Sequence, residues 1–161
     1  MSEHSPGKAP VLLVAYGTGP MSDAQLHLAC RSANDSGGVV HVLHVVERSR
    51  HIPLTVPLTA DEEAGVHRVL DRAEHIATSH GVRCHLDAVR ATAVGPAIIA
   101  AAHEHQARVI FLGLRDRDRT AASVLLSGTV RQVLQNAPCP VQIGYLPGRL
   151  PDDFARDRDK D

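Results

Sequence analysis

Glycine-containing segments are the first candidates for chemistry in this sequence. Gly17 and Gly19 follow an apolar run near the N-terminus, and Gly113 ends another apolar run far along the chain. Glycine lets a backbone approach a phosphate closely, and free amides at the start of a helix attract anions. Neither segment completes a Walker sequence, and Gly17-Thr18-Gly19 lacks the third glycine of a dinucleotide fingerprint. These segments therefore do not identify a ligand by themselves.

No arrangement typical of covalent catalysis accompanies these glycines. The sequence contains no Gly-x-Ser-x-Gly elbow. Cys139 lies between two prolines, and we interpret it as a small structural residue rather than as a redox-sensing thiol. We therefore expect no catalytic residues in this chain.

The eleven histidines raise the question of a metal site. His41 and His44 lie in a predicted strand at a spacing that should point their side chains to opposite faces. His103 and His105 lie in a predicted helix and should diverge by about 200°. Metal ligands must converge, so these spacings predict no dedicated metal site. Histidines scattered over the surface would instead make the net charge sensitive to pH near about 6.

Length and composition predict a single domain with an aliphatic core. The chain has 161 residues, of which 43% are hydrophobic and only 2% aromatic. The lack of aromatic platforms argues against single-stranded nucleic-acid binding, and a net charge of -1 argues against a broad attraction to nucleic acid or anionic membranes. Three isolated cysteines, with no apolar signal core and no run of transmembrane length, favour a cytoplasmic protein.

Short apolar runs alternate along the chain with segments of helical periodicity. The runs predict strands at residues 10–16, 39–46, 82–89, 109–112 and 141–145. The segments between them predict helices over 22–35, from a capping box at Thr59 and Glu62 to Gly81, over 96–106, and from about 127 onward.

This alternation predicts an α/β fold, namely a doubly wound, Rossmann-like parallel sheet with helices on both faces. Ligands in such sheets bind beyond the carboxyl ends of the strands, where the strand order reverses. The loop at residues 16–20 and the loop from Gly113 onward are therefore the candidate binding loops. Residues 1–8 are predicted to be a disordered N-terminal arm and 148–161 a charged tail, which leaves a domain over 9–147.

Three segments of the chain form a recognisable set. They run from Val11 to Thr18, from His41 to Glu47, and from Val109 to the closing pattern Gly-Thr-Val, Val-Leu and Ala-Pro-Cys-Pro-Val that ends at Val141. Together they resemble the universal stress protein family over about residues 9–146. The resemblance implies a five-stranded sheet of order 3-2-1-4-5. It also implies a homodimer that forms through the last strand, Val141 to Tyr145.

Nucleotide-binding members of that family carry a glycine motif, in which a glycine, two residues, a second glycine and nine residues precede a glycine followed by Ser or Thr. Gly113 fits the first glycine, and Gly128-Thr129 fits the last pair in residue type. Asp116 stands where the second glycine belongs, and the spacing from there to Gly128 is longer than the motif by two residues. In an alternative alignment, Ser127 takes the place of the last glycine.

Other positions also depart from the pattern. Those members carry an Asp at the end of the first strand, where this sequence has Tyr16 unless the alignment contains a gap. A shifted alignment puts Asp118 at the motif's distance from Gly128, but the first spacing then fails. An aspartate beside a phosphate costs on the order of 1–4 kcal/mol. Arg115 and the neighbouring arginines could offset this cost by clamping phosphates with their side chains.

Hypotheses from different classes follow. The first is a non-catalytic stress-response protein that acts as a homodimer through contacts with an unknown protein partner. The second is a sensor that binds an adenine nucleotide, ATP or AMP, at a modified glycine motif, and the third is an enzyme with slow ATPase activity. The resemblance implies nucleotide contacts at Ala15, Tyr16, Val45, Leu112, Gly113, Arg115, Ser127, Gly128, Thr129 and Val130.

Overall fold

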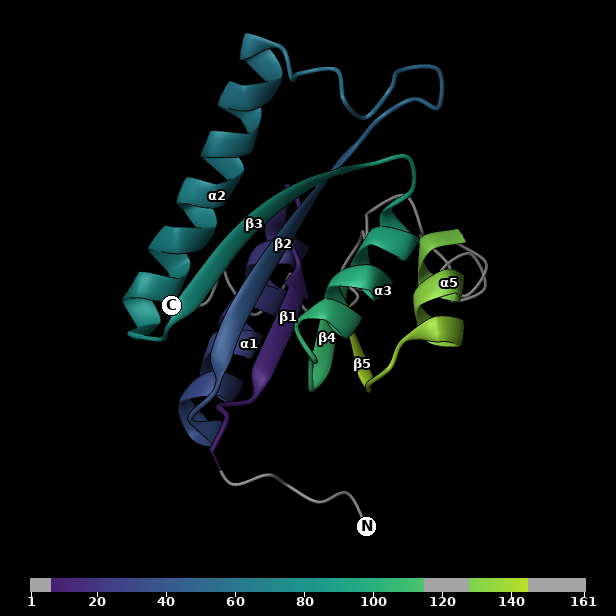
Figure 1. Cartoon of the computed structure of the whole chain (residues 1–161). Helices are drawn as coiled ribbons and strands as arrows, with labels where there is room; N and C mark the ends of the chain where they lie inside the picture. Colours follow the sequence, from purple (N-terminus) through teal and green to yellow (C-terminus); the bar gives the residue numbers. More distant parts are fainter. Residues whose placement is uncertain (1–6, 115–127, 145–161) are drawn as a thin grey trace, which may run out of the picture.

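A five-stranded parallel sheet in the order β3-β2-β1-β4-β5 forms the centre of the molecule (Figure 1). The structure is a computed structural model and describes residues 7–114 and 128–144. The strands are β1 (Val11–Ala15), β2 (Val39–Glu47), β3 (Cys84–Ala91), β4 (Val109–Gly113) and β5 (Val141–Gly144). The predicted α/β fold and the order 3-2-1-4-5 are therefore confirmed.

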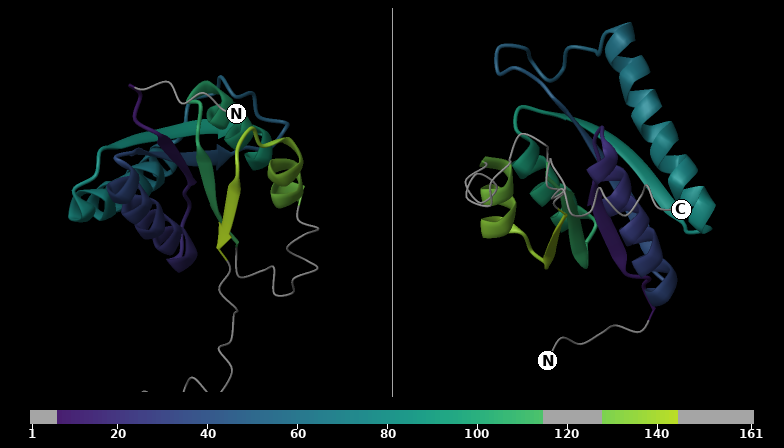
Figure 2. Two further views of the ribbon diagram at one scale, coloured as in Figure 1. Left: turned by 90° about the horizontal axis from the view of Figure 1, so that it is seen from below. Right: turned by 180° about the vertical axis from the view of Figure 1, so that it is seen from behind.

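Helices cover both faces of the sheet (Figure 2). They are α1 (Pro20–Ser36), α2 (Ala60–His80), α3 (Val94–Glu104) and α5 (Gly128–Asn136). One hydrophobic core lies between the sheet and the pair α1 and α2, and the other lies between the sheet and the pair α3 and α5. Within the described ranges, no helix combines the length and the apolar character that crossing a membrane requires.

The pattern of each strand follows from its place in the sheet. In β1, Leu12 and Val14 contribute to the core beneath α1 and α2, whereas Leu13 contributes to the opposite core. A central parallel strand is buried on both faces, so its sequence is a continuous apolar run. The edge strand β3 instead alternates between partly buried and exposed residues, as the alternating sequence predicts.

Several predicted boundaries shift by one or two residues, and two of these shifts have a clear physical reason. Helix α3 begins at Val94 rather than near Pro96, because a proline in the first turn loses no intrahelical hydrogen bond. Strand β3 begins at Cys84 rather than Val82, since the amide of Val82 still bonds to the carbonyl of Ala77 in α2. Tyr145, the predicted end of the last strand, lies outside the described residues, as do most of the N-terminal arm and all of the charged tail.

The predicted capping box at the start of α2 is confirmed. The Oγ1 atom of Thr59 accepts a hydrogen bond from the amide of Glu62 at 3.2 Å, and the carboxylate of Glu62 accepts one from the amide of Thr59 at 2.7 Å. Arg48, directly after β2, donates to the same carboxylate at 2.9 Å. This contact fixes the start of α2 beside the carboxyl end of β2. Helix α2 also contains Arg72, which binds Asp23 in the first turn of α1.

Candidate functional site

A cavity of about 430 Å³ opens at the carboxyl ends of β1, β2 and β4. The connections run to opposite sides of β1, so this edge is the point where the strand order reverses. The volume lies in the range of small-molecule pockets, which is about 300–1,000 Å³. The fold therefore provides a cavity at the place where the topology predicts a ligand.

Most of the predicted contact residues line this cavity. Seven of them do so: Ala15, Tyr16, Val45, Leu112, Gly113, Thr129 and Val130. Gly128 is the first residue of α5, directly before Thr129, and a β-carbon at this position would have no neighbour within 4 Å among the described residues. Arg115 and Ser127 lie outside the described residues. The structure thus brings the predicted residues of β1, β2, β4 and α5 together, and their contact with a nucleotide remains a prediction.

The cavity also has lining residues that the sequence analysis did not single out. His44 and Glu47 come from the carboxyl half of β2, and Val94 and Ile98 come from α3. The predicted position of β2 beside β1 could have indicated that His44 and Glu47 line the cavity. The α3 residues carried no comparable signal, because which turn of a crossover helix reaches the cavity depends on tertiary packing.

The loop after β1 presents backbone to the cavity. Gly17, Thr18 and Gly19 all line it, and Gly19 has a φ of 109°, which a residue with a β-carbon rarely adopts. Gly19 is the N-cap of α1, and no side chain caps this helix. The amide of Gly17 donates to Oγ of Ser22 at 3.1 Å. The start of α1 therefore faces the cavity with the partial positive charge of an uncapped helix.

Tyr16 directly follows β1 and is tied to β2 through its backbone. Its amide donates to the carbonyl of Leu43 at 2.9 Å, and Nδ1 of His44 donates to the carbonyl of Tyr16 at 2.9 Å. The ring of Tyr16 is buried in the core beneath α1 and α2. The position at which the family resemblance places an aspartate is therefore held rigidly and filled by a phenol.

The hydroxyl of Tyr16 donates to Oδ1 of Asp23 at 2.6 Å, and the guanidinium of Arg72 holds the same carboxylate from α2. Burial, followed by the hydrogen bond to Asp23, raises the pKa of the Tyr16 phenol. Hydrogen bonds from Arg72, with smaller contributions from Tyr16, lower the pKa of the Asp23 carboxyl. The negative charge of Asp23 in the first turn of α1 is thus balanced by the guanidinium of Arg72.

The charge around the cavity is sparse. Among the described residues that line it, Glu47 is the one carboxylate, and no lysine or arginine is present. The hydroxyls of Thr18, Ser22 and Thr129 are available as hydrogen-bond donors and acceptors. An anionic ligand would therefore be held by hydroxyls, by the amides of the loop after β1 and by the start of α5, within the part of the chain that the structure describes.

Comparison with known proteins adds a family to this geometry. The sequence matches the model of the universal stress protein family over residues 10–143. A search of curated proteins finds no match. Among solved structures, a member of this family from Burkholderia pseudomallei is 25% identical, with a TM-score of 0.63 and with 86% of this chain and 98% of that chain covered.

Two more distant structures contain nucleotides. The universal stress protein from Archaeoglobus fulgidus in complex with dAMP is 18% identical, with a TM-score of 0.65 and coverage of 84% of this chain and 97% of that one. A family protein from Arabidopsis thaliana with AMP bound is 14% identical, with a TM-score of 0.61 and coverage of 91% and 99%. At these identities the two structures support the fold, and the family match carries the assignment. This chain belongs to the universal stress protein family.

Proposed function

We propose that this chain binds an adenine nucleotide, in the form of a monophosphate, in the cavity at the carboxyl edge of the sheet, and that it does not turn the nucleotide over. The observation that carries the proposal is the cavity itself, which seven residues implied by the family resemblance line together. The structures of relatives with dAMP and AMP support the choice of an adenine nucleotide.

The two sides of the cavity suit the two ends of such a ligand. Leu43, Val45 and Leu112, together with Ile98 of α3, provide apolar surface against which a base can pack. The backbone after β1 and the start of α5 provide a polar environment that suits a phosphate. This division favours a ligand with one flat apolar part and one compact anionic part.

The charges around the cavity favour a nucleotide with one phosphate group over a nucleotide with three. Glu47 lines the cavity, and no lysine or arginine of the described residues does so. In the sequence, Asp116 replaces the second glycine of the family motif, although this position and that of the neighbouring Arg115, which could offset its charge, lie outside the described residues. Each added phosphate raises the repulsion from such carboxylates. We therefore expect AMP to bind more tightly than ATP.

The same lining argues against catalysis. Phosphoryl transfer needs cationic groups that stabilise the charge on the transferred phosphoryl. His44 is the one histidine among the described lining residues, and its Nδ1 is engaged by the carbonyl of Tyr16. Phosphate release from ATP above a protein-free blank, lost in a Gly128→Asp variant, would contradict the non-catalytic part of the proposal.

Calorimetric titration of the full chain with AMP and ATP tests the binding. Ala15 lines the cavity and is partly buried, so Ala15→Leu adds volume where the ligand would lie. We expect this variant to lose AMP binding by about tenfold or more, which is a loss of about 1.4 kcal/mol. Ala24→Leu, at an exposed position of α1, is the matched control and should bind as the wild type does. The absence of heat at millimolar AMP, or equal binding by Ala15→Leu, would refute the proposal.

We also propose that the chain acts as a homodimer through β5. This strand lies at the edge of the sheet and pairs only with β4 among the described strands, so one row of its backbone groups has no strand partner within the described residues. Gln142 is exposed on this strand, and Gln142→Lys would place like charges near a two-fold axis. Sedimentation at micromolar concentration should show a wild-type dimer that Gln142→Lys weakens, whereas Gln135→Lys on α5 should not. A monomeric wild type would exclude this interface.

A further inference from the structure

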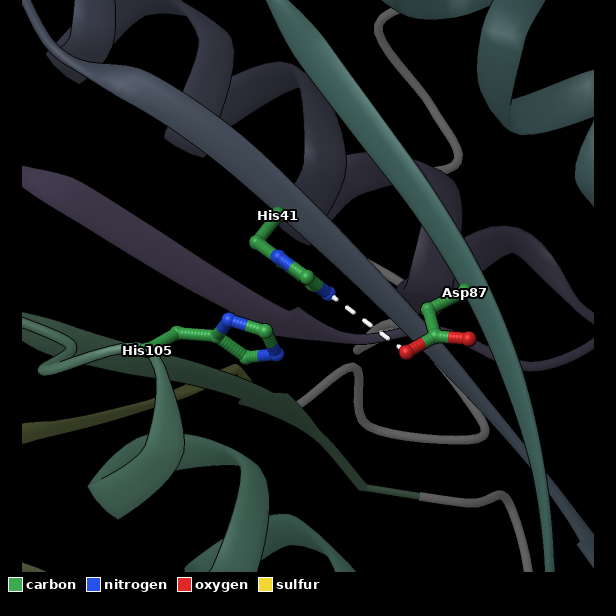
Figure 3. A group of neighbouring side chains, drawn as sticks. All are labelled: His41, Asp87 and His105. Atoms are coloured by element: carbon green, nitrogen blue, oxygen red, sulfur yellow. Dashed lines mark ion pairs between the residues drawn. The ribbon is translucent and has the colours of Figure 1, made fainter.

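Three potential metal ligands from three different elements converge on the face of the sheet that α3 covers. They are His41 of β2, Asp87 of β3 and His105, the C-cap residue of α3 (Figure 3). One ligand atom from each side chain lies within 4.8 Å of the others. Figure 3 shows His41 and Asp87 directed toward one another across the two strands, with the ring of His105 beside them.

The sheet register explains why the first two side chains meet. His41 pairs with His85, and Leu43 pairs with Asp87, so Asp87 lies one diagonal step from His41. Side chains two residues apart in a strand share a face, so both point toward α3. This juxtaposition depends only on the backbone pairing of β2 and β3.

The third potential ligand, His105, lies at the end of α3. The amide of His105 closes the last turn of the helix by bonding to the carbonyl of Ala101. Gln106 then adopts a φ of 51°, a left-handed conformation that is uncommon for a residue with a β-carbon. The helix therefore stops at His105, and the ring centroids of His105 and His41 lie 4.0 Å apart.

The environment of His41 is an independent indication that a ligand binds to this group of side chains. The residue is only 7% exposed, and its Nε2 atom is buried without a hydrogen-bond partner among the described residues. Oδ2 of Asp87 is 4.0 Å from this nitrogen, which is too far for a hydrogen bond. Buried polar atoms are normally paired, so this nitrogen lacks the partner that burial requires.

We propose that His41 Nε2, the carboxylate of Asp87 and a ring nitrogen of His105 bind a divalent transition-metal ion, and that this ion is Zn²⁺. Two imidazole nitrogens and one carboxylate oxygen are a donor set that zinc accepts, with a further position left for water. A metal ion requires neutral imidazole nitrogens and an ionised carboxylate as its ligands.

The geometry allows this binding with small side-chain movements. Zinc–nitrogen and zinc–oxygen bonds of about 2.0–2.2 Å place two tetrahedral ligand atoms about 3.4 Å apart. The separation of 4.0 Å between His41 and Asp87 must therefore shrink by about 0.6 Å, and the other separations, which are within 4.8 Å, by at most about 1.4 Å. The side chain of Asp87 is 48% exposed, so it can turn without disturbing the core.

An entry path is also present. Asp87, Glu104 and His105 line a second cavity of about 400 Å³ between β3 and α3. Water can reach the proposed ion through this opening, and the carboxylate of Glu104 adds negative charge nearby. The ring centroid of His85, which pairs with His41 in the sheet, lies 6.2 Å from that of His41.

This site is separate from the proposed nucleotide site. None of its three residues lines the cavity at the carboxyl edge, and Leu43 lies between the two cavities and contributes to both. The proposed ion would join the edge strand β3 to α3 and to the interior of the sheet. Because the unfolded chain does not hold these ligands together, the ion should stabilise the folded protein.

The test uses the full chain without an affinity tag, after removal of metal ions by dialysis against a chelator. Zn²⁺ is titrated in competition with a chromophoric chelator, and the wild type should bind one equivalent. Loss of an outer-shell residue at a metal site typically costs about 10–100-fold in affinity, so Asp87→Asn and His105→Gln should each cost at least about 100-fold. His67→Gln, at an exposed position of α2, is the matched control and should leave the affinity unchanged.

A second readout does not depend on the variants folding. Histidine ring resonances in the NMR spectrum of the wild type should shift on zinc addition for His41 and His105 and not for His67. Co²⁺ bound in place of Zn²⁺ in the wild type should give visible absorption that one equivalent of Zn²⁺ abolishes. Binding that is equal in wild type, Asp87→Asn and His105→Gln, or ring shifts confined to surface histidines, would overturn the proposal. No nucleotide is present in these experiments, so their outcome is independent of the proposed nucleotide binding.

Discussion

The hydroxyl of Tyr16 donates a hydrogen bond of 2.6 Å to Oδ1 of Asp23, and Arg72 of α2 holds the same carboxylate. This chain of contacts joins the end of β1, the first turn of α1 and the middle of α2. It stabilises the loop that borders the cavity and balances a negative charge at its edge. The residue that departs from the family pattern at the end of the first strand is thus part of the support of the site.

A double-mutant cycle measures this contact. Tyr16→Phe removes the hydroxyl, and Asp23→Asn removes the charge of its acceptor. A hydrogen bond to a charged group contributes about 1.5–3 kcal/mol, and Arg72 still binds Asp23 in the Phe variant, so we expect a coupling of about 1–2 kcal/mol. Urea denaturation of the wild type, both single variants and the double variant gives the coupling. Strictly additive effects would show that the two side chains do not interact.

Acid should weaken the same network in a defined pH window. Arg72 lowers the pKa of Asp23, so near pH 4 the folded state binds fewer protons than the unfolded state does. The resulting stabilisation is complete above the unfolded carboxyl pKa of about 3.9 and is lost as the pH falls through the lower folded value.

Denaturation of the wild type and Asp23→Asn between about pH 2 and 6 tests this expectation. The stability difference between them should shrink below about pH 4. Asp35→Asn, at an exposed position near the end of α1, removes a carboxylate of equal charge for which the described residues provide no ion pair. If both variants change the acid profile equally, the ion pair with Arg72 is not the cause.

Restoring the motif glycine should improve triphosphate binding. Asp116→Gly removes a carboxylate that costs on the order of 1–4 kcal/mol next to a phosphate, so ATP affinity should rise by about tenfold or more. AMP affinity should rise less, because AMP places less charge at this segment. Calorimetry with both nucleotides compares Asp116→Gly with Asp118→Gly, which occupies the motif spacing in the shifted alignment. Unchanged ATP affinity in both variants would contradict the charge argument.

A side chain at Gly144 should disturb the contact between α1 and β5, because the ends of the Gln25 and Met21 side chains would have to move. A β-carbon there would lie 1.8 Å from Nε2 of the buried Gln25 and 2.7 Å from Cε of Met21. We expect Gly144→Ala to destabilise the protein by about 1–3 kcal/mol, as overpacking does. Gly65→Ala inside α2 meets only Arg68, at 3.8 Å, and should instead stabilise by about 0.5–1 kcal/mol. Denaturation curves of the two variants measure these changes in stability. Equal effects of the two substitutions would argue against the close packing of α1 against β5.

The sequence by itself determined the features that rest on local physics. The apolar run of β1, the alternation of β3 and the capping box at Thr59 and Glu62 each follow from backbone geometry over a few residues, and all three are present in the structure. The order of the elements, with the family resemblance, also predicted the sheet. It predicted the cavity's place as well, because parallel strands end at a common edge.

Only the tertiary structure decided which distant side chains meet. The sequence analysis compared His41 with His44 and His103 with His105, since these pairs are close along the chain. The structure instead brings His41 to Asp87 through strand register and to His105 through the end of a crossover helix. Tyr16, Asp23 and Arg72 are likewise joined by the packing of α1 against α2. Such contacts depend on how whole elements are packed, and residue spacing along the chain does not specify this.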